Sequence, residues 1–242
     1  MVKFQNVSFS YDGEHPVLED LSFTINKGEA VGLIGANGAG KSTIMNLLLG
    51  LLKGSGEILV DGLPVNKQNL PQIRQKIGFV LQNSDNQMFM PTVYEDMMFG
   101  PLNYGLSREE AEQRVDKVLD MLGLQALKHR HNHKISGGEK RMAAIATILA
   151  MEPEMIVMDE PSTALDPVNR RRVINTINSL PQTKLIASHD LDMILDTCQR
   201  VLLISRGKIV ADGDAEAVLL DKALLEANQM ELPFCVQGWQ RK

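Results

Sequence analysis

Gly35-Ala36-Asn37-Gly38-Ala39-Gly40-Lys41-Ser42 decides the fold of this chain. The octapeptide fits the pattern G-x-x-x-x-G-K-[ST], in which glycines let the backbone close into a nest whose N–H groups converge on phosphate oxygens. In such a loop Lys41 reaches the β- and γ-phosphates, and Ser42 places its hydroxyl on Mg²⁺. A helix that begins near Gly40 points its positive end at the same anion. The pattern therefore predicts a binding site for a nucleoside triphosphate and Mg²⁺.

The residues on either side of the loop have the patterns that such a site requires. Residues 29–34 form a short apolar run suited to a buried strand, and residues 43–49 continue as an apolar helix that Gly50 helps to end. Strand, glycine loop and helix follow one another in the order of a phosphate-binding unit. The alternative is a glycine-rich turn that fits the pattern by chance, and the flanks argue against it.

Composition narrows the class of protein. Of the 242 residues, 44% are hydrophobic and 23% charged, as in ordinary globular proteins. The net charge of −5 argues against a nucleic-acid binder that depends on overall basicity. Cys198 and Cys235 are too few for a disulfide framework and indicate reduced cytosolic thiols. The start lacks the apolar core of a signal peptide, and the longest apolar run, residues 142–151, is too short to span a bilayer. We therefore expect a soluble intracellular enzyme.

Strand-like and helix-like patterns alternate along the chain, which predicts an α/β fold with a mostly parallel sheet. Residues 2–9 and 21–25 alternate apolar and polar instead, as antiparallel strands with one wet face do. From about Val93 to Met151 the pattern is helical and includes a capping box at residues 107–110. Further strands are expected at residues 56–62, 77–81, 155–159, 184–188 and 200–204.

These patterns predict a single domain over residues 1–242. A nucleotide-binding core takes residues 1–91 and 152–213 and contains the antiparallel part. A helical subdomain of residues 92–151 is inserted into this core, and residues 214–242 form a C-terminal segment that begins as a helix.

A second chemical motif lies at Asp159-Glu160, where the apolar run Ile156-Val157-Met158 ends in two acids. A buried strand of an α/β sheet delivers such acids to its carboxyl end, where ligands bind. Asp159 can hold Mg²⁺ directly or through water, and Glu160 can polarise the attacking water as a general base. The alternative is a pair of solvated acids that cap the strand.

Ile135-Ser136-Gly137-Gly138-Glu139 resembles the signature motif of ABC-type ATPases, with Ile for the commoner Leu and Glu for the commoner Gln. Other motifs of that family follow in order, and the resemblance covers about Phe4 to Gly213. It implies a P-loop NTPase of the ABC-ATPase fold, with a RecA-like core sheet, that binds ATP and Mg²⁺ and hydrolyses ATP. Two such subunits would face each other head to tail, with each ATP between the phosphate loop of one and the Ser-Gly-Gly of the other.

The resemblance also implies individual roles. Tyr11 matches the aromatic residue that stacks on adenine, and Gln82 the glutamine that links the metal site to the transport partner. Residues 164–166 match the loop that crosses to the other subunit, and His189 the histidine that contacts the γ-phosphate. The implied catalytic residues are Glu160, His189, Gln82 and Lys41, and the implied Mg²⁺ ligands are Ser42, Gln82 and Asp159. The implied nucleotide-binding residues are Tyr11, Gly35, Asn37, Gly38, Ala39, Gly40, Lys41, Ser42, Thr43, Ser136, Gly137 and Gly138.

A narrower resemblance lies in residues 82–103 and 139–146, which look like ATPases of energy-coupling-factor importers. Membership would make the chain a peripheral subunit on the cytoplasmic face of the cell membrane. It would work with a second ATPase subunit, identical or a sibling, a membrane-embedded coupling protein and a substrate-binding membrane subunit. Residues 85–90 would contact the coupling protein, unless Met88, Phe89 and Met90 pack in the core. The sequence is most similar to the cobalt- and nickel-type ATPases, and a B-vitamin importer is the alternative.

Three other functional classes are alternatives to transport. A DNA-end ATPase of the same superfamily would carry a long coiled coil between phosphate loop and signature, and a ribosome-acting one two domains per chain. A small-molecule kinase would not need the Ser-Gly-Gly.

His129, His131 and His133 suggest a metal site, but a solvated loop is the preferred interpretation. Residues 170–172, three arginines, are interpreted as an exposed helix start and Cys198 as a buried thiol in a helix-like run.

Overall fold

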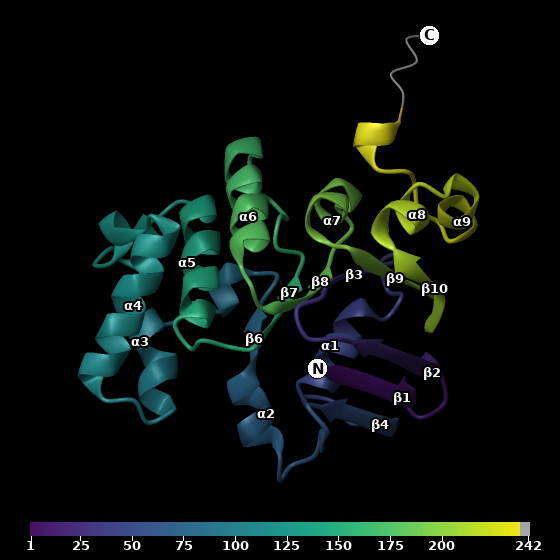
Figure 1. Ribbon diagram of the computed structural model, residues 1–242, viewed down its shortest axis with the longest axis horizontal. Helices are drawn as coiled ribbons and strands as arrows, with labels where there is room; N and C mark the ends of the chain where they lie inside the picture. Colours follow the sequence, from purple (N-terminus) through teal and green to yellow (C-terminus); the bar gives the residue numbers. More distant parts are fainter. Residues whose placement is uncertain (238–242) are drawn as a thin grey trace. The chain divides into compact units, whose positions relative to one another are not determined.

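The computed structural model describes residues 1–237, which fall into two compact units. The first unit combines residues 1–74 with the described residues from 181 onward, and the second holds residues 75–180. The ribbon in Figure 1 follows both units along the chain. The second unit contains the predicted helical subdomain of residues 92–151 and is wider than it, because it also includes strands and a helix on either side. The last five residues of the predicted C-terminal segment lie outside the described residues.

An antiparallel sheet forms the N-terminal part of the first unit, in the order β2-β1-β4-β5. Its strands are β1 (Val2–Ser10), β2 (Pro16–Ile25), β4 (Ser55–Val60) and β5 (Leu63–Pro64). Val2, Phe4 and Val7 are buried, and the Phe4 ring stacks on Phe23 of β2 with centroids 4.4 Å apart. The alternation in residues 2–9 and 21–25 thus predicted β1 and the second half of β2, because one face of each packs and the other is wet; β2 begins earlier than predicted, at Pro16.

A second sheet of the first unit carries the phosphate loop. Its central strand β3 (Ala30–Ile34) is buried along its whole length and pairs in parallel with β8 (Thr183–Ala187) and β9 (Arg200–Ser205). Strand β10 (Lys208–Asp214) is antiparallel to β9. The helices of this unit are α1 (Lys41–Leu48), α7 (Leu191–Thr197), α8 (Ala215–Leu219) and α9 (Lys222–Ala227), followed by the 3₁₀ turn Phe234–Val236.

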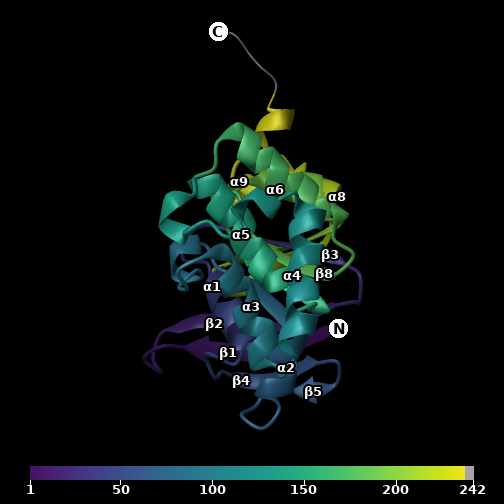
Figure 2. The same ribbon diagram turned by 90° about the vertical axis from the view of Figure 1, so that its left-hand side faces the viewer.

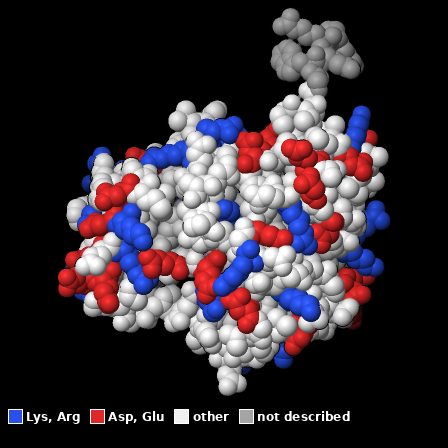
Figure 3. All heavy atoms as spheres, in the orientation of Figure 1, with Lys and Arg blue, Asp and Glu red and all other residues white. Residues whose placement is uncertain are grey.

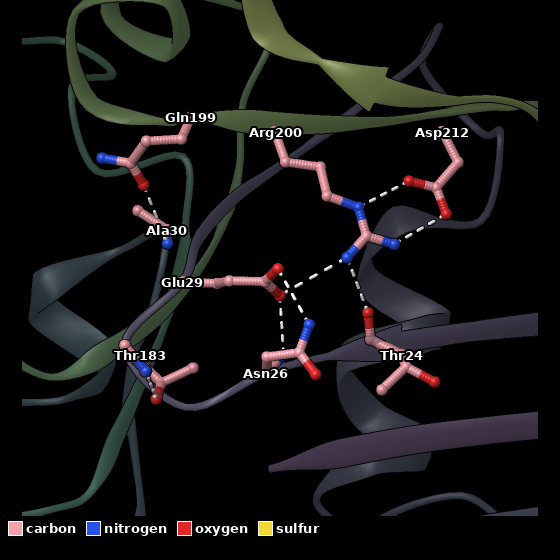
Figure 4. Close-up of polar contacts among 9 residues, drawn as sticks. Thr24, Asn26, Glu29, Ala30, Thr183, Gln199, Arg200 and Asp212 are labelled. Carbon is pink, nitrogen blue, oxygen red and sulfur yellow. Dashed lines mark hydrogen bonds and ion pairs between the residues drawn. The ribbon is translucent and has the colours of Figure 1, made fainter.

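Arg200 fixes the start of this sheet (Figure 4). Its guanidinium binds both carboxylate oxygens of Asp212, at 2.6 and 2.7 Å, and donates to the Thr24 carbonyl at 2.9 Å and to Glu29 at 3.4 Å. Burial alone would raise the pKa of Glu29, but hydrogen bonds from Asn26 and the charge of Arg200 outweigh it and hold the pKa below its usual value. Glu29 directly precedes β3, so this cluster anchors the strand that ends at the phosphate loop.

The second unit holds the strands β6 (Ile77–Val80) and β7 (Met155–Asp159), which pair in parallel. Its helices are α3 (Val93–Asn103), α4 (Arg108–Leu122), α5 (Gly137–Leu149) and α6 (Pro167–Ser179), with 3₁₀ turns at Ser84–Asn86, Gln125–Leu127 and Asn132–Lys134. Helix α2 (Leu70–Lys76) crosses the boundary between the two ranges. Helices α3, α4 and α5 pack on one another (Figure 2). The predicted α/β fold is confirmed.

Within residues 1–237, no helix combines the length and apolar character needed to cross a membrane.

Candidate nucleotide-binding site

The predicted site residues divide between the two units. The phosphate loop, Tyr11 and His189 belong to the first unit, whereas Gln82, Ser136, Asp159 and Glu160 belong to the second.

The phosphate loop connects β3 to α1, as the sequence predicted. Gly35 has a φ of 152°, and a Cβ atom there would stand 2.3 Å from the backbone oxygen of Ile204. No larger residue fits at this position without moving β9. No side chain caps the N-terminus of α1, where Gly40 is the N-cap. The loop is thus a glycine turn that leads into a helix N-terminus with a glycine N-cap, the arrangement in which such helices bind anions.

Lys41 lies inside the loop. Its side chain is buried, and its ammonium donates to the carbonyls of Gly35 at 2.6 Å and Ala36 at 3.2 Å. The cation is therefore held over the nest formed by the loop. Ser42, the next residue, is exposed, whereas Thr43 is buried.

Tyr11 lies beside the first turn of α1. Its hydroxyl is 3.3 Å from the Thr43 hydroxyl, and its ring packs edge-on against Phe9 at a centroid distance of 4.8 Å. The Tyr11 side chain is nevertheless 66% exposed. An aromatic ring fixed at its hydroxyl and edge, with much of its surface open, is suited to stack on an adenine base next to the phosphate loop.

His189 leaves the same edge of the sheet as the phosphate loop. Strands β3 and β8 are parallel, with Leu33 opposite Ala187, so both chains emerge at their carboxyl ends. Ser188 is fully buried and its N–H donates to the Leu33 carbonyl at 3.4 Å, whereas His189 is exposed. Ligands of α/β sheets bind at this edge.

The two acids of the second unit differ in environment. Strand β7 is buried up to Met158; Asp159 is half-buried, and Glu160 is 6% exposed. Glu160 has a φ of 48°, a left-handed conformation that non-glycine residues seldom adopt and that clusters at functional sites. Thr163 donates to the Glu160 carboxylate at 3.5 Å and, through its N–H, to the Glu160 carbonyl at 3.2 Å. The acids are thus not two equally solvated strand caps.

Arg141 positions the backbone at Gln82, a role that the sequence analysis did not assign. The side chain is buried in α5 and donates to the Leu81 carbonyl at 2.6 Å and to the Gln82 carbonyl. Burial lowers the pKa of Arg141, and the charge of Asp159 opposes this. A charged residue within an otherwise apolar helix face was the available signal.

The segment after Gln82 is held on α5 but leaves one aromatic ring exposed. Gln87 donates to the Ala144 carbonyl at 2.6 Å and to the Thr147 hydroxyl at 3.0 Å. Met88 is buried, whereas Phe89 is 62% exposed and meets Phe99 edge-on at 4.9 Å. Met88 therefore packs in the core, whereas Phe89 lies on the surface, and contact of residues 85–90 with a coupling protein stays a prediction.

The signature motif opens helix α5. Ser136 is the N-cap and accepts from the Glu139 N–H at 3.3 Å, while the Glu139 carboxylate accepts from the Ser136 N–H at 2.7 Å. These hydrogen bonds hold the pKa of Glu139 below its usual value. Glu and Gln serve equally at this third position of a capping box, which explains why Glu139 can replace the commoner Gln.

Gly138 contacts the helix that follows residues 164–166. A Cβ atom on Gly138 would stand 2.2 Å from Asn169, whereas one on Gly137 would meet nothing within 4 Å. Asp166 is the N-cap of α6; its carboxylate accepts from the N–H groups of Val168 at 2.9 Å and Asn169 at 3.0 Å, and from the Asn169 side chain. Asn169 therefore lies between the signature and the N-cap of α6, and the sequence analysis did not single it out.

The histidines, arginines and cysteine that the sequence singled out have surroundings that account for them without a ligand. His129, His131 and His133 are exposed, and among the described residues no cluster of three or more His, Cys, Asp or Glu side chains could hold a metal ion. Of the three arginines, Arg171 is exposed, but Arg170 and Arg172 are half-buried, and Arg172 donates to the Leu122 and Gly123 carbonyls at 2.9 and 3.3 Å. The expectation of an exposed helix start is thus wrong for Arg170 and Arg172, and Arg172 satisfies carbonyls at the end of α4. Cys198 is buried just after α7, and burial raises the pKa of its thiol to about 11.

Comparison with known proteins adds an independent finding. Residues 18–163 match the sequence profile of the ABC transporter family. The energy-coupling factor transporter ATP-binding protein EcfA of Methanothermobacter thermautotrophicus is 41% identical over an aligned length of 239 residues, and the match covers 96% of this chain and 77% of EcfA.

Solved structures of the same kind share the fold. That of cbiO1 from Clostridium perfringens, part of the ABC transporter complex cbiONQ, superposes with a TM-score of 0.84 at 33% identity and covers 93% of each chain. The dimeric ABC transporter cassette MJ0796 superposes with a TM-score of 0.79 at 28% identity, over 89% of this chain and 99% of that one.

Proposed function

Because this chain belongs to the ABC transporter family, as a subunit that binds and hydrolyses ATP, we propose that it powers an energy-coupling-factor importer of cobalt or nickel ions. The observation that carries the proposal is the likeness to cbiO1 over 93% of the chain, because that protein is part of the complex cbiONQ. The 41% identity to EcfA supports the same type of importer.

The chemistry of the donors fits an ATP site with Mg²⁺. Ser42, Gln82 and Asp159 offer a hydroxyl, an amide oxygen and a carboxylate, which are the hard oxygen ligands that Mg²⁺ prefers, besides phosphates and water. When bound, the ion would neutralise charge that develops on the phosphates. Lys41 and the N-terminus of α1 would bind the same phosphates.

Hydrolysis is assigned to Glu160 as the residue that orients and deprotonates the attacking water. His189 would contact the γ-phosphate, and Gln82 would report the state of the site to the transport partner. Tyr11 would stack on adenine. The remaining donors would come from a second subunit, whose Ser136, Gly137 and Gly138 would face the γ-phosphate at the N-terminus of α5. ATP would thus join the two subunits, and its hydrolysis would let them separate.

The exposed aromatic pair Phe89–Phe99 supports contact with a membrane-embedded coupling protein. Phe89 is 62% exposed and Phe99 43% exposed, and apolar surface of this kind is suited to protein contact. On the face drawn in Figure 3, acidic and basic side chains are interspersed. The chain would therefore reach the cytoplasmic face of the membrane through its partners, with a substrate-binding membrane subunit in the same complex and no nucleic acid.

A pull-down of the tagged protein from its native membranes in mild detergent, analysed by mass spectrometry, tests the proposal. The untagged strain is the control. A coupling protein with metal-type subunits and no second ATPase would support a homodimeric metal importer. A sibling ATPase with vitamin-binding subunits would move the proposal to a B-vitamin importer. Soluble DNA or ribosomal partners alone would contradict transport.

A further inference from the structure

A buried polar pair joins two surface segments of the second unit. Asp96, on α3, is 6% exposed, and Asn132, in the 3₁₀ turn Asn132–Lys134, is 8% exposed. The Asp96 carboxylate accepts a hydrogen bond from the Asn132 side chain. A carboxylate is costly to bury, so the contacts around it are required for the fold to keep it there.

The pair holds the segment that carries Phe89. The Asp96 carboxylate accepts from the N–H groups of Phe89 and Met90, both at 3.1 Å. The Asn132 side chain donates to the Met90 carbonyl at 2.6 Å. Burial raises the pKa of Asp96, and the hydrogen bonds that its carboxylate accepts from Met90, Phe89 and Asn132 oppose the rise. The backbone of residues 89–90 is thus fixed by two side chains from elsewhere in the unit.

The same pair lies next to the signature motif. Asn132 is four residues before Ser136, and its own N–H donates to the Pro91 carbonyl at 3.1 Å. Residues 92 and 131 form a bridge, and the Val93 N–H donates to the Arg130 carbonyl at 3.2 Å. The backbone of residues 90–93 therefore runs beside residues 130–132, and the buried Asp96–Asn132 pair lies at this junction.

We propose that Asp96 and Asn132 are positioning residues that couple the movement of residues 87–92, which include Phe89, to the movement of residues 130–136, which lead into Ser136. The inference rests on the proposed function, in which Phe89 contacts the membrane partner and Ser136 contacts ATP. A displacement at either end is then transmitted through the junction, because backbone hydrogen bonds join residues 91–93 to residues 130–132 and the Asp96–Asn132 pair fixes residues 89–90 to them. A separate link holds residues 81–87 on the body of α5, since Gln87 donates to the Ala144 carbonyl of α5 and Arg141 of α5 donates to the Leu81 carbonyl.

Hydrogen exchange on the isolated ATPase tests this coupling without the membrane partner. Exchange is measured with and without ATP in a Glu160→Gln background, in which bound ATP persists. In the parent, ATP is expected to slow exchange in peptides that cover residues 130–139 and also in peptides that cover residues 87–92. Asp96→Ala is expected to abolish the ATP response of residues 87–92 and to leave that of residues 130–139.

Three further variants make the result specific. Asn132→Leu keeps the side-chain size but removes the donor, so it should lose the same response even if Asp96→Ala fails to fold. Asp96→Asn keeps the oxygen that accepts from Phe89 and Met90 but turns an NH2 group toward the Asn132 NH2, so it should keep part of the response that Asp96→Ala loses. Tyr94 lies on α3, as Asp96 does, and its hydroxyl donates to Glu112 of α4 at 2.6 Å. Tyr94→Phe removes that hydrogen bond and should respond to ATP like the parent.

The outcomes separate the two proposals. An unchanged ATP response at residues 87–92 in Asp96→Ala and Asn132→Leu would overturn the coupling. Faster exchange in both segments, equal with and without ATP, would show a purely structural role and would overturn it as well. Lack of ATP protection at residues 130–139 in the parent would contradict the proposed ATP contact of Ser136, and the inference would fall with it.

Discussion

Glu160 is the residue on which the proposed chemistry depends most. It is buried and carries a left-handed backbone, whereas its neighbour Asp159 is half-buried with an extended strand before it. A strained conformation persists only where the surroundings impose it. Here the Glu160 carbonyl and carboxylate are both held by Thr163, so the side chain has one preferred direction.

Glu160→Gln is expected to slow ATP hydrolysis by roughly 10²-fold or more, because it removes the base and leaves the size of the side chain unchanged. ATP affinity should stay near that of the parent, since the phosphate donors are untouched. Steady-state phosphate release and ATP titration of the same preparation measure the two quantities. Near-parental turnover would rule out the assigned role.

The close approach of Gly138 to Asn169 predicts how substitutions at the two signature glycines change stability. Gly138→Ala puts a methyl group 2.2 Å from Asn169, and overpacking of this kind costs about 1–3 kcal/mol of the free energy of unfolding. Gly137→Ala has open space and should be stable, because Ala is up to about 1 kcal/mol better than Gly within a helix. Chemical denaturation measures both changes.

The Asn169→Ala background provides the control for this clash. If the clash is real, Gly138→Ala costs much less stability there than in the parent. Equal losses in the two backgrounds would contradict it.

Among the elements, α4 and α5 are a matched pair, because each begins with a complete capping box. Ser107 and Glu110 cap α4 as Ser136 and Glu139 cap α5. Ser107→Ala and Ser136→Ala should each lower the free energy of unfolding by about 1 kcal/mol, since each leaves a helix N–H without its acceptor. Only Ser136→Ala should slow ATP hydrolysis, because only α5 is assigned to the nucleotide of the partner subunit. Equal effects on hydrolysis would refute that assignment.

The helices and loops also differ in how well their buried residues can be predicted from the sequence. Helix α4 was predicted from its capping box and helical pattern, because a regular helix repeats its geometry, and its buried residues follow that repeat: Ala111, Val115, Val118, Leu119 and Leu122. The segment after Gln82 has no such period. Which of Met88 and Phe89 is buried there depends on anchors such as Gln87 and Asp96, which are fixed only by tertiary contacts.

At the scale of the whole molecule, contiguous motifs could be predicted from the sequence and long-range contacts could not. The phosphate loop and the signature each occupy a short run with a recurring pattern. Arg141, in contrast, binds a carbonyl 60 positions away, and nothing in the local pattern names its partner. The transported substrate could not be predicted from these residues either, because the resemblance places its binding site on a membrane subunit and not on this chain.

The assembly of two subunits gives the last prediction. In a head-to-tail dimer, Ser136 serves the nucleotide of the partner, so a substitution there should spare ATP binding by the monomer and prevent dimer formation. Glu160→Gln with ATP is expected to form a dimer in size-exclusion chromatography with light scattering. Adding Ser136→Arg should return it to a monomer, because a large cation replaces the N-cap hydroxyl that faces the γ-phosphate.

Ser107→Arg is the matched control, because it places the same cation at the N-cap of α4 and should leave the ATP-dependent dimer intact. Monomeric ATP affinity, measured by fluorescence titration at low protein concentration, should be the same in all variants. A Ser136→Arg protein that binds ATP poorly as a monomer would mean that Ser136 contacts the nucleotide of its own chain, and the head-to-tail arrangement would then be wrong.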